Sequence, residues 1–582
     1  MFRFKGFFLA FTLAAQAAQG QYQEWVTVVG SRLNPSPLRR VLVWQQGEIS
    51  RLPLRHWSDL LRYAAGVGLA RRGLFGVQGD TALLGSTFEG VLVLVNGIPV
   101  NDPQTGHFHL NVPIPLEAIE RVEVLTGAAS SVLGSNAFGG VIAITTRPGT
   151  SALVGASAGS FSFSGLTLAV PLFSQLGFFG EMQESQGFRP DSDFHQGRAL
   201  LAWGGSLGRW QVATSLGAGR SQFGAWTFYS SRFPHQRERT NVALLTFRAE
   251  RALSPSLTVA VAAGARQHRD VYLLDKTRPW WYRNRHRTRQ ATMSVLLRGE
   301  RPQWQWVLGA DGERQLLQSS RLGLHDRNRA GLFAEVSGFR GPWRVNVQAR
   351  QDLFAGQARF TPGAGVSFTF PSGAQLSLSL GTAFRLPSFT ELYYRSPASL
   401  GNPRLGPERA QAGEVTLSLP WRGHRWQLSA FRRHAHGLID WVRGEDGVFR
   451  AQNYARSVSW GVTGDWVQDQ GPVPWRLSAA YLESQVAADP RRSAYALTHP
   501  RWEGSFSATV PWGRLLFTPV LLYRKPQGRG GFALVDAAWQ WPLSRQLALR
   551  GEVHNLLDRA YEEVPGVPQP GRWWTLGLTW RP

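Results

Sequence analysis

Apolar and polar residues alternate with a period of two along most of this chain, and this pattern limits its fold more than any other feature. In residues 343–350, for example, Trp343, Val345 and Val347 alternate with Arg344 and Asn346. Strict alternation places one set of side chains on each face of a β-sheet. A helical membrane protein is excluded, because beyond the N-terminus the sequence contains no apolar run of about 18 residues.

Two observations favour a membrane barrel over a water-soluble β-sandwich, whose strands also alternate. Trp occurs 24 times and often stands at the end of an alternating run, where the aromatic girdle of a membrane barrel belongs. The face opposite the apolar one carries Arg, Gln, Asn, Ser and Thr, as a hydrated lumen requires. Since lipid does not tolerate an open sheet edge, we predict an all-β membrane protein with a closed antiparallel transmembrane β-barrel.

The basic charge does not indicate a nucleic-acid partner. The formal net charge is +24, from 63 basic and 39 acidic residues, but the arginines are scattered at strand-like spacing. A nucleic-acid binder tends to cluster its basic residues on one face or tail. We therefore expect no nucleic acid, and interpret the arginines as lining a barrel wall or meeting phosphates at the membrane surface. Cys is absent, which excludes disulfides and thiolate metal sites.

The first 20 residues have the features of a secretory signal peptide. Arg3 and Lys5 precede the short apolar stretch Phe7–Ala15, and small residues suited to cleavage follow at positions 15–20. This stretch is too short for a stable membrane anchor. We predict a signal peptide over residues 1–20 and export of the mature chain.

Residues 41–147 differ from the rest of the chain, because short β-like runs are separated there by glycines and one helix. The expected elements are a helix over 59–65 capped by Ser58, strands over 91–95, 121–125 and 141–146, and a turn at Asn96-Gly97. We predict a small N-terminal α+β plug domain over 41–147 that lies in the lumen of a barrel formed by 148–582. Barrels with a plugged lumen have about 22 strands.

Several motifs in this order carry a family resemblance. They are the runs Gly90–Gly97, Asn101–His107, Pro113–Leu125 and Gly134–Thr146, followed by Ala383–Tyr393, Gly401–Glu408 and Val553–Arg572. Together they resemble the TonB-dependent outer-membrane receptors, and the run Asn101–His107 looks most like the cobalamin-receptor branch of that family.

The resemblance implies an energy-coupling segment, the TonB box, in the linker over residues 21–40. The run Glu24, Trp25, Val26, Thr27, Val28 and Val29 resembles such a box, although an ordinary first strand is the alternative. A short extended segment of this kind can add its backbone as a strand to a partner protein. The expected partner is a TonB-type coupling protein.

Three plug positions depart from the family pattern. The family has Arg at the position of Leu84 and within the run Thr126-Gly127-Ala128. It usually has Asp at the position of Asn96. In the family these Arg and Asp residues form buried ion pairs between plug and wall, so their absence puts in doubt any plug movement borrowed from relatives. The final Arg581-Pro582 replaces the usual terminal aromatic residue and leaves the details of barrel assembly open.

The candidate ligand-binding residues lie in and after the turn at 101–107. We expect Asn101, Asp102, Gln104, His107 and His109 to contact solute at the outward apex of the plug, although packing against the barrel wall is the alternative. No catalytic set is apparent, so we expect no enzyme activity, no cofactor and no metal site.

Three further groups have competing interpretations. His434 and His436 share a strand face and suit a metal or haem iron, but a lumen-facing basic patch is favoured because Arg432 and Arg433 adjoin them. Asp191 and Asp193 predict a turn rather than a calcium site. The basic and aromatic run Trp280–Arg289 predicts a membrane girdle or a loop that catches an anionic ligand.

The expected function is TonB-dependent import of a scarce, bulky metal-chelate solute across the cell outer membrane by a monomer embedded in lipid. Cobalamin is favoured over haem and iron-siderophores, and a passive outer-membrane channel is the weakest alternative. Cobalamin and haem are both flat macrocycles that need aromatic contact and a few polar groups.

Overall fold

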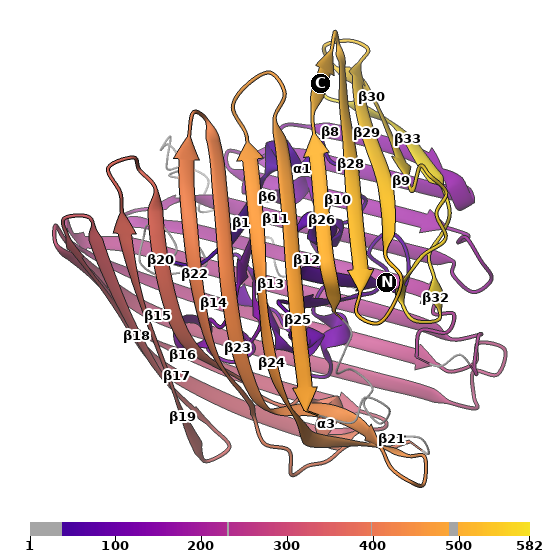
Figure 1. The fold of residues 1–582 in the computed structure, drawn as a ribbon. Helices are drawn as coiled ribbons and strands as arrows, with labels where there is room; N and C mark the ends of the chain where they lie inside the picture. Colours follow the sequence, from indigo (N-terminus) through magenta and orange to yellow (C-terminus); the bar gives the residue numbers. More distant parts are fainter. Residues whose placement is uncertain (1–37, 230–231, 397–398, 488–498) are drawn as a thin grey trace.

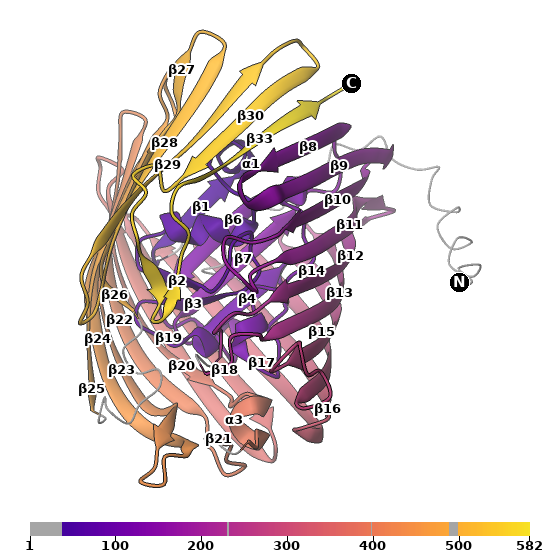
Figure 2. The same ribbon diagram turned by 90° about the vertical axis from the view of Figure 1, so that its right-hand side faces the viewer.

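The structure is a computed structural model that describes residues 38–229, 232–396, 399–487 and 499–582 (Figure 1). The predicted signal peptide, residues 1–20, and the predicted TonB box, residues 24–29, lie outside the described residues. The described chain forms a large barrel with a smaller domain inside it, as two perpendicular views show (Figures 1 and 2).

In the described part of the chain, 22 antiparallel strands close into a barrel in which the first strand pairs with the last. The strands are β8 Leu153–Gly159, β9 Phe163–Phe173, β10 Leu176–Ser185, β11 Phe194–Leu207, β12 Trp210–Gly224, β13 Arg237–Ser254, β14 Leu257–Leu273, β15 Arg283–Arg301, β16 Trp304–Ser319, β17 Gly323–Arg340, β18 Trp343–Phe354, β19 Gln357–Thr369, β20 Gln375–Arg385, β22 Glu408–Trp421, β23 His424–Arg443, β24 Phe449–Gln468, β25 Trp475–Ala487, β26 Pro500–Ala508 continued by β27 Val510–Trp512, β28 Leu515–Pro526, β29 Phe532–Pro542, β30 Leu547–His554 and β33 Trp573–Trp580. This architecture confirms the predicted closed barrel and its strand number.

The barrel is apolar outside and polar inside. On β18, Trp343 and Val345 are 51% and 50% exposed, whereas Arg344 and Asn346 are 7% and 2% exposed. The same inversion holds on β33, where Trp574 and Leu576 face outward and Thr575 is buried. A water-soluble sandwich would bury the apolar set instead. The exposed apolar face therefore requires lipid around it.

The two mouths of the barrel differ in the length of their connections. At one mouth strands are joined by short turns such as Gly208–Arg209, and at the other by longer connections such as residues 386–407 and 555–572. Exposed Trp residues at strand ends mark the short-turn mouth: Trp304, Trp343, Trp421, Trp512, Trp541 and Trp580. In outer-membrane barrels the short turns face the periplasm and the longer loops face outward. We call these the short-turn mouth and the loop mouth.

Short segments also occur in the loop-mouth connections. They are the helices η5 Ser160–Ser162 and α3 Phe389–Tyr393 and the strands β21 Ser399–Leu400, β31 Glu562–Val564 and β32 Val567–Pro568. Within the described residues, none of the helices is both long and apolar enough to cross a membrane.

The domain inside the barrel is a five-stranded mixed sheet in the order β1-β6-β7-β4-β5, with a separate β2–β3 hairpin. Its elements are β1 Val41–Gln45, α1 Gln46–Ile49, η1 Trp57–Tyr63, β2 Val67–Arg71, β3 Gly79–Leu83, η2 Phe88–Gly90, β4 Val91–Val95, β5 Ile98–Pro99, η3 Gly106–Phe108, η4 Leu116–Ala118, β6 Ile119–Thr126, α2 Ser130–Leu133 and β7 Gly140–Thr146. Because this domain fills the lumen (Figure 2), it is the predicted plug.

Local sequence rules predicted most of the plug strands. The strand at 91–95 is confirmed, and the turn at Asn96-Gly97 is formed by two residues with positive φ, 52° and 80°, as a tight hairpin turn needs. The helix expected over 59–65 is wrong in its bounds. It is a 3₁₀ helix that begins at Trp57, because the ring of His56 caps it together with the Asp59 carboxylate.

Plug and wall share one hydrophobic core. Val93 and Leu110 of the plug belong to the same buried cluster as Phe179, Leu200 and Val520 of the wall. The plug is therefore packed against the barrel rather than suspended in a water-filled lumen.

Candidate functional site

The plug apex, residues 71–80 and 101–109, faces the loop mouth and is covered by barrel loops. The backbone N–H groups of Phe389 and Thr390 in α3 donate to the carbonyl oxygens of Pro103 and Gln104 at 2.9 and 3.0 Å. On the opposite side, Arg72 donates to the carbonyl of Phe228 at 2.5 Å. The predicted site residues thus lie at the mouth expected to face outward.

The side chain of Asn101 connects the apex loop to strand β4 of the plug by hydrogen bonds. Its Oδ1 accepts from the N–H of Val93 at 2.8 Å, and its Nδ2 donates to the carbonyl of Val91 at 2.7 Å. The Nδ1 of His109 lies 3.0 Å from the same amide. Burial lowers the pKa of His109 to about 4, so its ring is neutral at pH 7. Both side chains hold the apex loop onto strand β4.

Asp102 joins the apex to the wall. Its Oδ2 lies 2.7 Å from Nη1 of Arg266 and 2.9 Å from Nδ1 of His268, both on β14. Burial alone would raise the pKa of Asp102, but Arg266 and His268 more than offset that effect and hold the pKa well below its usual range. Removing one partner of such a buried pair is strongly destabilising, because it leaves an uncompensated charge.

His107 is the predicted site residue that keeps a partly exposed side chain. Its Nδ1 lies 2.7 Å from Oδ1 of Asp80, and its ring stacks on Phe88 at 4.6 Å. Gln104 is buried, and its Oε1 has no hydrogen-bond partner among the described residues. The structure therefore brings the five predicted residues together at the apex but directs most of them into the plug and the wall. Their contact with solute stays a prediction.

Four tyrosines at the loop mouth lie near one another, and we call them the tyrosine rim: Tyr229, Tyr272, Tyr282 and Tyr394. They are too scattered in the sequence to be grouped by a motif. The rings of Tyr229 and Tyr272 meet edge to face at 5.3 Å. The hydroxyls of Tyr282 and Tyr394 lie 3.4 Å apart, and Tyr394 contacts Trp441 edge to face at 6.3 Å. Each ring offers an apolar face and a polar tip.

Two arginines fasten the loop 386–407 to the barrel: Arg327 donates to the carbonyl of Pro387 at 2.7 Å, and Arg385 forms ion pairs at both ends of the loop. Arg385 binds Glu391 of α3 at 2.8 Å and Glu408 of β22 at 2.5 Å. Glu89 of the plug lies in the same acidic cluster and accepts from the N–H of Gly106 at 2.8 Å. Burial, with a further contribution from Glu391, raises the pKa of Glu89 to about 8. The plug therefore presents a neutral carboxyl to this loop at neutral pH.

Buried ion pairs fasten the plug at several heights. Within the described residues they include Arg40–Asp465 at 2.5 Å, Arg55–Glu552 at 2.7 Å, Arg62–Asp536 at 3.0 Å, Arg71–Glu563 at 2.7 Å and Glu48–Arg476 at 2.8 Å. They occur at positions other than those at which the sequence departs from the family pattern. In the first four pairs the barrel contributes the carboxylate. In the last pair it contributes Arg476, which binds Glu48 of the plug.

The departing positions make neutral contacts with the wall. Asn96 donates to the hydroxyls of Ser215 and Thr246 at 3.2 and 3.1 Å. Leu84 packs against Phe431 and Leu482. The side chains of Asn96 and Leu84 thus contact the wall without forming an ion pair.

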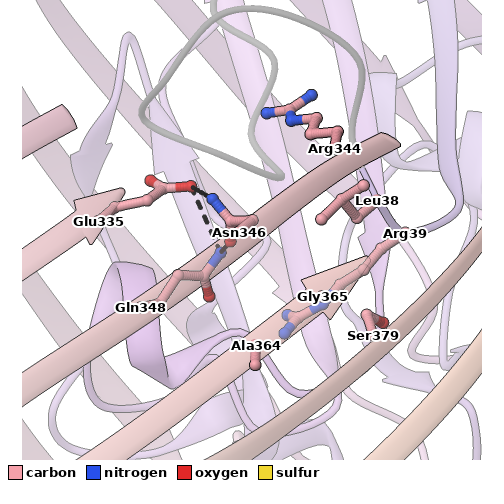
Figure 3. Close-up of a pocket in the computed structure, with 9 residues that line it drawn as sticks. All are labelled: Leu38, Arg39, Glu335, Arg344, Asn346, Gln348, Ala364, Gly365 and Ser379. Carbon is pink, nitrogen blue, oxygen red and sulfur yellow. Dashed lines mark hydrogen bonds between the residues drawn. The ribbon is translucent and has the colours of Figure 1, made fainter. Parts of the chain in front are cut away.

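Two cavities lie in the seam between the plug and strands β15–β20. One is lined by Asn101 and Asn136 of the plug and by Gln315, Arg327 and Arg329 of the wall. The other, nearer the short-turn mouth, lies beside Leu38 and Arg39; there Glu335 accepts from Asn346 and Gln348 (Figure 3). Polar side chains line most of both cavities.

The histidine pair on β23 does not belong to this site. His434 and His436 share the outward face with Arg432 and the exposed Leu428, whereas Arg433 points inward and donates to the carbonyl of Leu84 at 2.8 Å. The predicted lumen-facing basic patch is therefore wrong for the two histidines, because the alternation of the strand directs them away from the lumen.

The acidic pair at 191–193 contacts basic side chains of neighbouring segments. Asp191 lies 2.6 Å from His235 and also contacts Lys276, and Asp193 lies 2.8 Å from Arg237. The predicted turn is present at 190–191. Among the described residues, no group of three or more His, Asp or Glu side chains is arranged to hold a metal ion.

Comparison with known families matches both parts of the chain. Residues 177–556 match the family described as "TonB dependent receptor-like, beta-barrel", and residues 38–141 match "TonB-dependent Receptor Plug Domain".

Individual relatives are distant in sequence. The chain is 22% identical over 598 aligned positions to "Vitamin B12 transporter BtuB" of Vibrio vulnificus (strain YJ016), covering 94% of this chain and 92% of that protein. Among solved structures, "Copper transporter OprC" matches with a TM-score of 0.79 at 18% identity, covering 95% and 99% of the two chains. The siderophore receptor PirA from Pseudomonas aeruginosa matches with a TM-score of 0.71 at 19% identity, covering 94% and 99%. At these identities the structural likeness concerns the fold.

Proposed function

Since this chain belongs to the family of TonB-dependent receptors, which reside in the outer membrane, we propose that it imports a scarce, bulky solute by energy-coupled movement of the plug. The observation that carries this proposal is a lumen filled by a plug that is held by buried ion pairs such as Arg40–Asp465 and Arg62–Asp536. Breaking such a pair without replacing its partner costs about 3–5 kcal/mol. A plug fastened in this way needs external work to move.

The TonB box at residues 24–29 is the proposed point at which that work is applied. Its apolar, β-branched residues suit the addition of a strand to a TonB-type partner. The plug begins directly after the linker, and among the described residues Arg39 and Arg40, at the end of that linker, are the first buried charged side chains. Tension on the linker therefore reaches Arg40–Asp465 first among the buried pairs. A passive channel would not need a plug that is connected to a coupling segment.

We assign cobalamin as the solute, with haem and iron-siderophores as the alternatives of the same architecture. The tyrosine rim, Tyr229, Tyr272, Tyr282 and Tyr394, supplies aromatic faces with polar tips, which suits a flat macrocycle bordered by amides. The histidine pair considered as a ligand for haem iron, His434 and His436, lies on the outer face of β23, away from the lumen. Of the predicted apex residues Asn101, Asp102, Gln104, His107 and His109, His107 is best placed for first contact.

Copper is disfavoured by the ligand chemistry of the chain. Copper(I) prefers thiolate and thioether ligands. The chain has no Cys and three Met, and the two Met in the described residues, Met182 and Met293, are 53% and 57% exposed on the outer face of the barrel. A soft-metal site at the plug apex would need other donors.

Uptake of labelled cobalamin tests the proposal. The gene is expressed in a bacterium that lacks its own cobalamin receptor, with and without a functional TonB protein. We expect saturable uptake that needs TonB. Uptake that continues without TonB would indicate a passive channel, and TonB-dependent uptake of haem or a ferric siderophore without any of cobalamin would retain the receptor but change its solute.

A further inference from the structure

Strand β15 carries a row of arginines on its outward face. The alternation places Arg283, Arg285, Arg287 and Arg289 outward, with Arg287 half-buried and the others exposed, while the residues between them point into the lumen. Immediately below, the same face continues with Ala291, Met293, Val295 and Leu297. The outer face thus changes from charged to apolar within one step of the alternation, which marks the boundary between the hydrocarbon layer and its polar surface.

The arginines continue sideways over the neighbouring strands. In hydrogen-bond register, Arg220 of β12 lies opposite Asn241, Asn241 opposite Arg269 of β14, and Arg269 opposite Arg287. Strands β12–β16 lie side by side on one flank of the barrel (Figure 2). We call Arg220, Arg239, Arg269, Arg285, Arg287 and Arg289 the outer arginine patch.

The patch is not neutralised by the protein. Within the described residues, none of its six arginines has a carboxylate within 4.0 Å. Their neighbours are neutral amides: Arg239 donates to Oε1 of Gln222 at 3.0 Å, and Arg287 donates to Oε1 of Gln267 at 2.6 Å. Arg269 and Arg287 lie directly opposite each other, and like charges in that position destabilise a sheet.

An apolar row borders the patch on the membrane side. Leu216, Leu245, Ala265 and Ala291 follow one another in register across β12–β15, and Leu216 and Leu245 are 53% and 45% exposed. A soluble polyanion would contact only the arginines. A lipid molecule can contact both the arginines and the apolar row. Its acyl chains would lie on the apolar row and its headgroup on the arginines.

We propose that the outer arginine patch binds phosphate groups on the headgroups of outer-leaflet lipid. Arginine suits phosphate because its planar fork donates two parallel hydrogen bonds. The bound phosphates remove the repulsion between Arg269 and Arg287. This site lies on the outer wall of the barrel and is independent of solute import.

The test compares lipid binding by full-length protein in detergent, measured by native mass spectrometry. The probe is lipid A with both phosphates, and the same lipid without phosphate is the reference. The patch variant is Arg269→Gln, Arg287→Gln and Arg289→Gln. The matched control removes three exposed arginines at the short-turn mouth: Arg209→Gln, Arg301→Gln and Arg340→Gln.

Each basic residue near an anionic surface contributes about 1 kcal/mol. The patch variant should therefore lose on the order of a hundredfold in affinity for phosphorylated lipid A, and the control should bind like wild type. Equal binding by the patch variant, or equal binding of the phosphate-free lipid by wild type, would overturn the proposal. So would tighter binding of a DNA duplex than of lipid A, which would assign the patch to a soluble polyanion. If the patch variant fails to fold, the salt dependence of wild-type binding decides, because a phosphate site must weaken as salt rises.

Discussion

Arg62 of the plug lies 3.0 Å from Asp536 of β29, and both side chains are almost completely buried. Arg62 belongs to η1, so a single contact connects a plug helix to the wall. Asp536 also accepts from the backbone N–H of Asn555 at 2.8 Å, which links the pair to the start of the loop 555–572. The pair thus joins three separate parts of the fold.

Removing one partner should loosen the plug. Arg62→Ala leaves the buried Asp536 carboxylate without its arginine, with His554 3.6 Å away as its remaining basic neighbour. Removing one partner of a buried ion pair costs about 3–5 kcal/mol. We expect proteolysis of the plug at a clearly lower urea concentration than in wild type. Arg425→Ala is the control, because Arg425 and Asp469 form an exposed pair and such pairs contribute little. Equal urea midpoints for the two variants would contradict this role of Arg62.

Closure of the loop 386–407 over the plug should weaken at alkaline pH. Burial first, and Glu391 second, raises the pKa of Glu89 from its ordinary 4.5 to about 8, although Arg385 acts in the opposite direction. Folded protein thus binds this proton more tightly than unfolded chain does. The contribution of the neutral carboxyl is complete below about pH 4.5 and is lost as the pH rises through about 8.

Hydrogen-exchange protection of residues 389–394 measures that closure. Protection factors should fall between pH 7 and pH 9 in wild type, because ionised Glu89 repels Glu391 and Glu408. Glu89→Gln keeps the shape of the side chain without the charge and should flatten this dependence. A fall of the same size in the variant would show that another group is responsible.

Deleting the plug should open the barrel. A chain that lacks residues 21–147 should still insert, because β8–β33 close without it, and it should conduct ions in planar bilayers. The full chain, with its lumen filled, serves as the control and should show near-zero conductance. Near-zero conductance of the deleted chain would mean that something else blocks the lumen.

The TonB box prediction depends on backbone pairing. Proline has no N–H and cannot donate to a strand ladder, so Val28→Pro should abolish energised uptake and leave solute binding unchanged. Val28→Ile, which keeps both the N–H and the β-branched shape, should transport like wild type. Wild-type uptake in the proline variant would show that residues 24–29 are not the coupling segment.

His107 should contribute to solute affinity, because its side chain stays partly exposed at the plug apex. His107→Ala should weaken binding about tenfold, the equivalent of about one charge-assisted hydrogen bond, in a titration followed by Trp fluorescence. His195→Ala is the control, since that histidine is exposed on the outer face of the barrel. Unchanged affinity in His107→Ala would shift the site to the tyrosine rim.

Local patterns in the sequence were enough to predict the barrel. Alternation over residues such as 343–350 and 574–580 defines the two faces, and the Asn96-Gly97 pair defines a hairpin turn because both residues accept positive φ. The cap of η1 was missed, because a histidine ring replaced the hydroxyl that helix-capping rules expect at that position.

The site was harder to predict because its contacts join distant segments. Nothing near Arg40 in the sequence indicates Asp465, and nothing near Asp102 indicates Arg266. The side of the wall on which a residue lies depends on the register of the whole sheet. A shift by one residue reverses every side chain, which is why His434 and His436 were assigned to the lumen and lie on the outside.

Pairing between β8 and β33 makes the last strand of the barrel as critical as the first. Leu576 and Leu578 lie opposite Ala158 and Ala156, and no other strand in the described chain can cover either edge. A stop codon at position 573 would remove β33 and leave two edges of unpaired N–H and C=O groups, each unsatisfied group costing several kcal/mol in lipid. The barrel can therefore close only after β33 has been synthesised. Nonsense alleles that remove β33 should behave as complete losses of function.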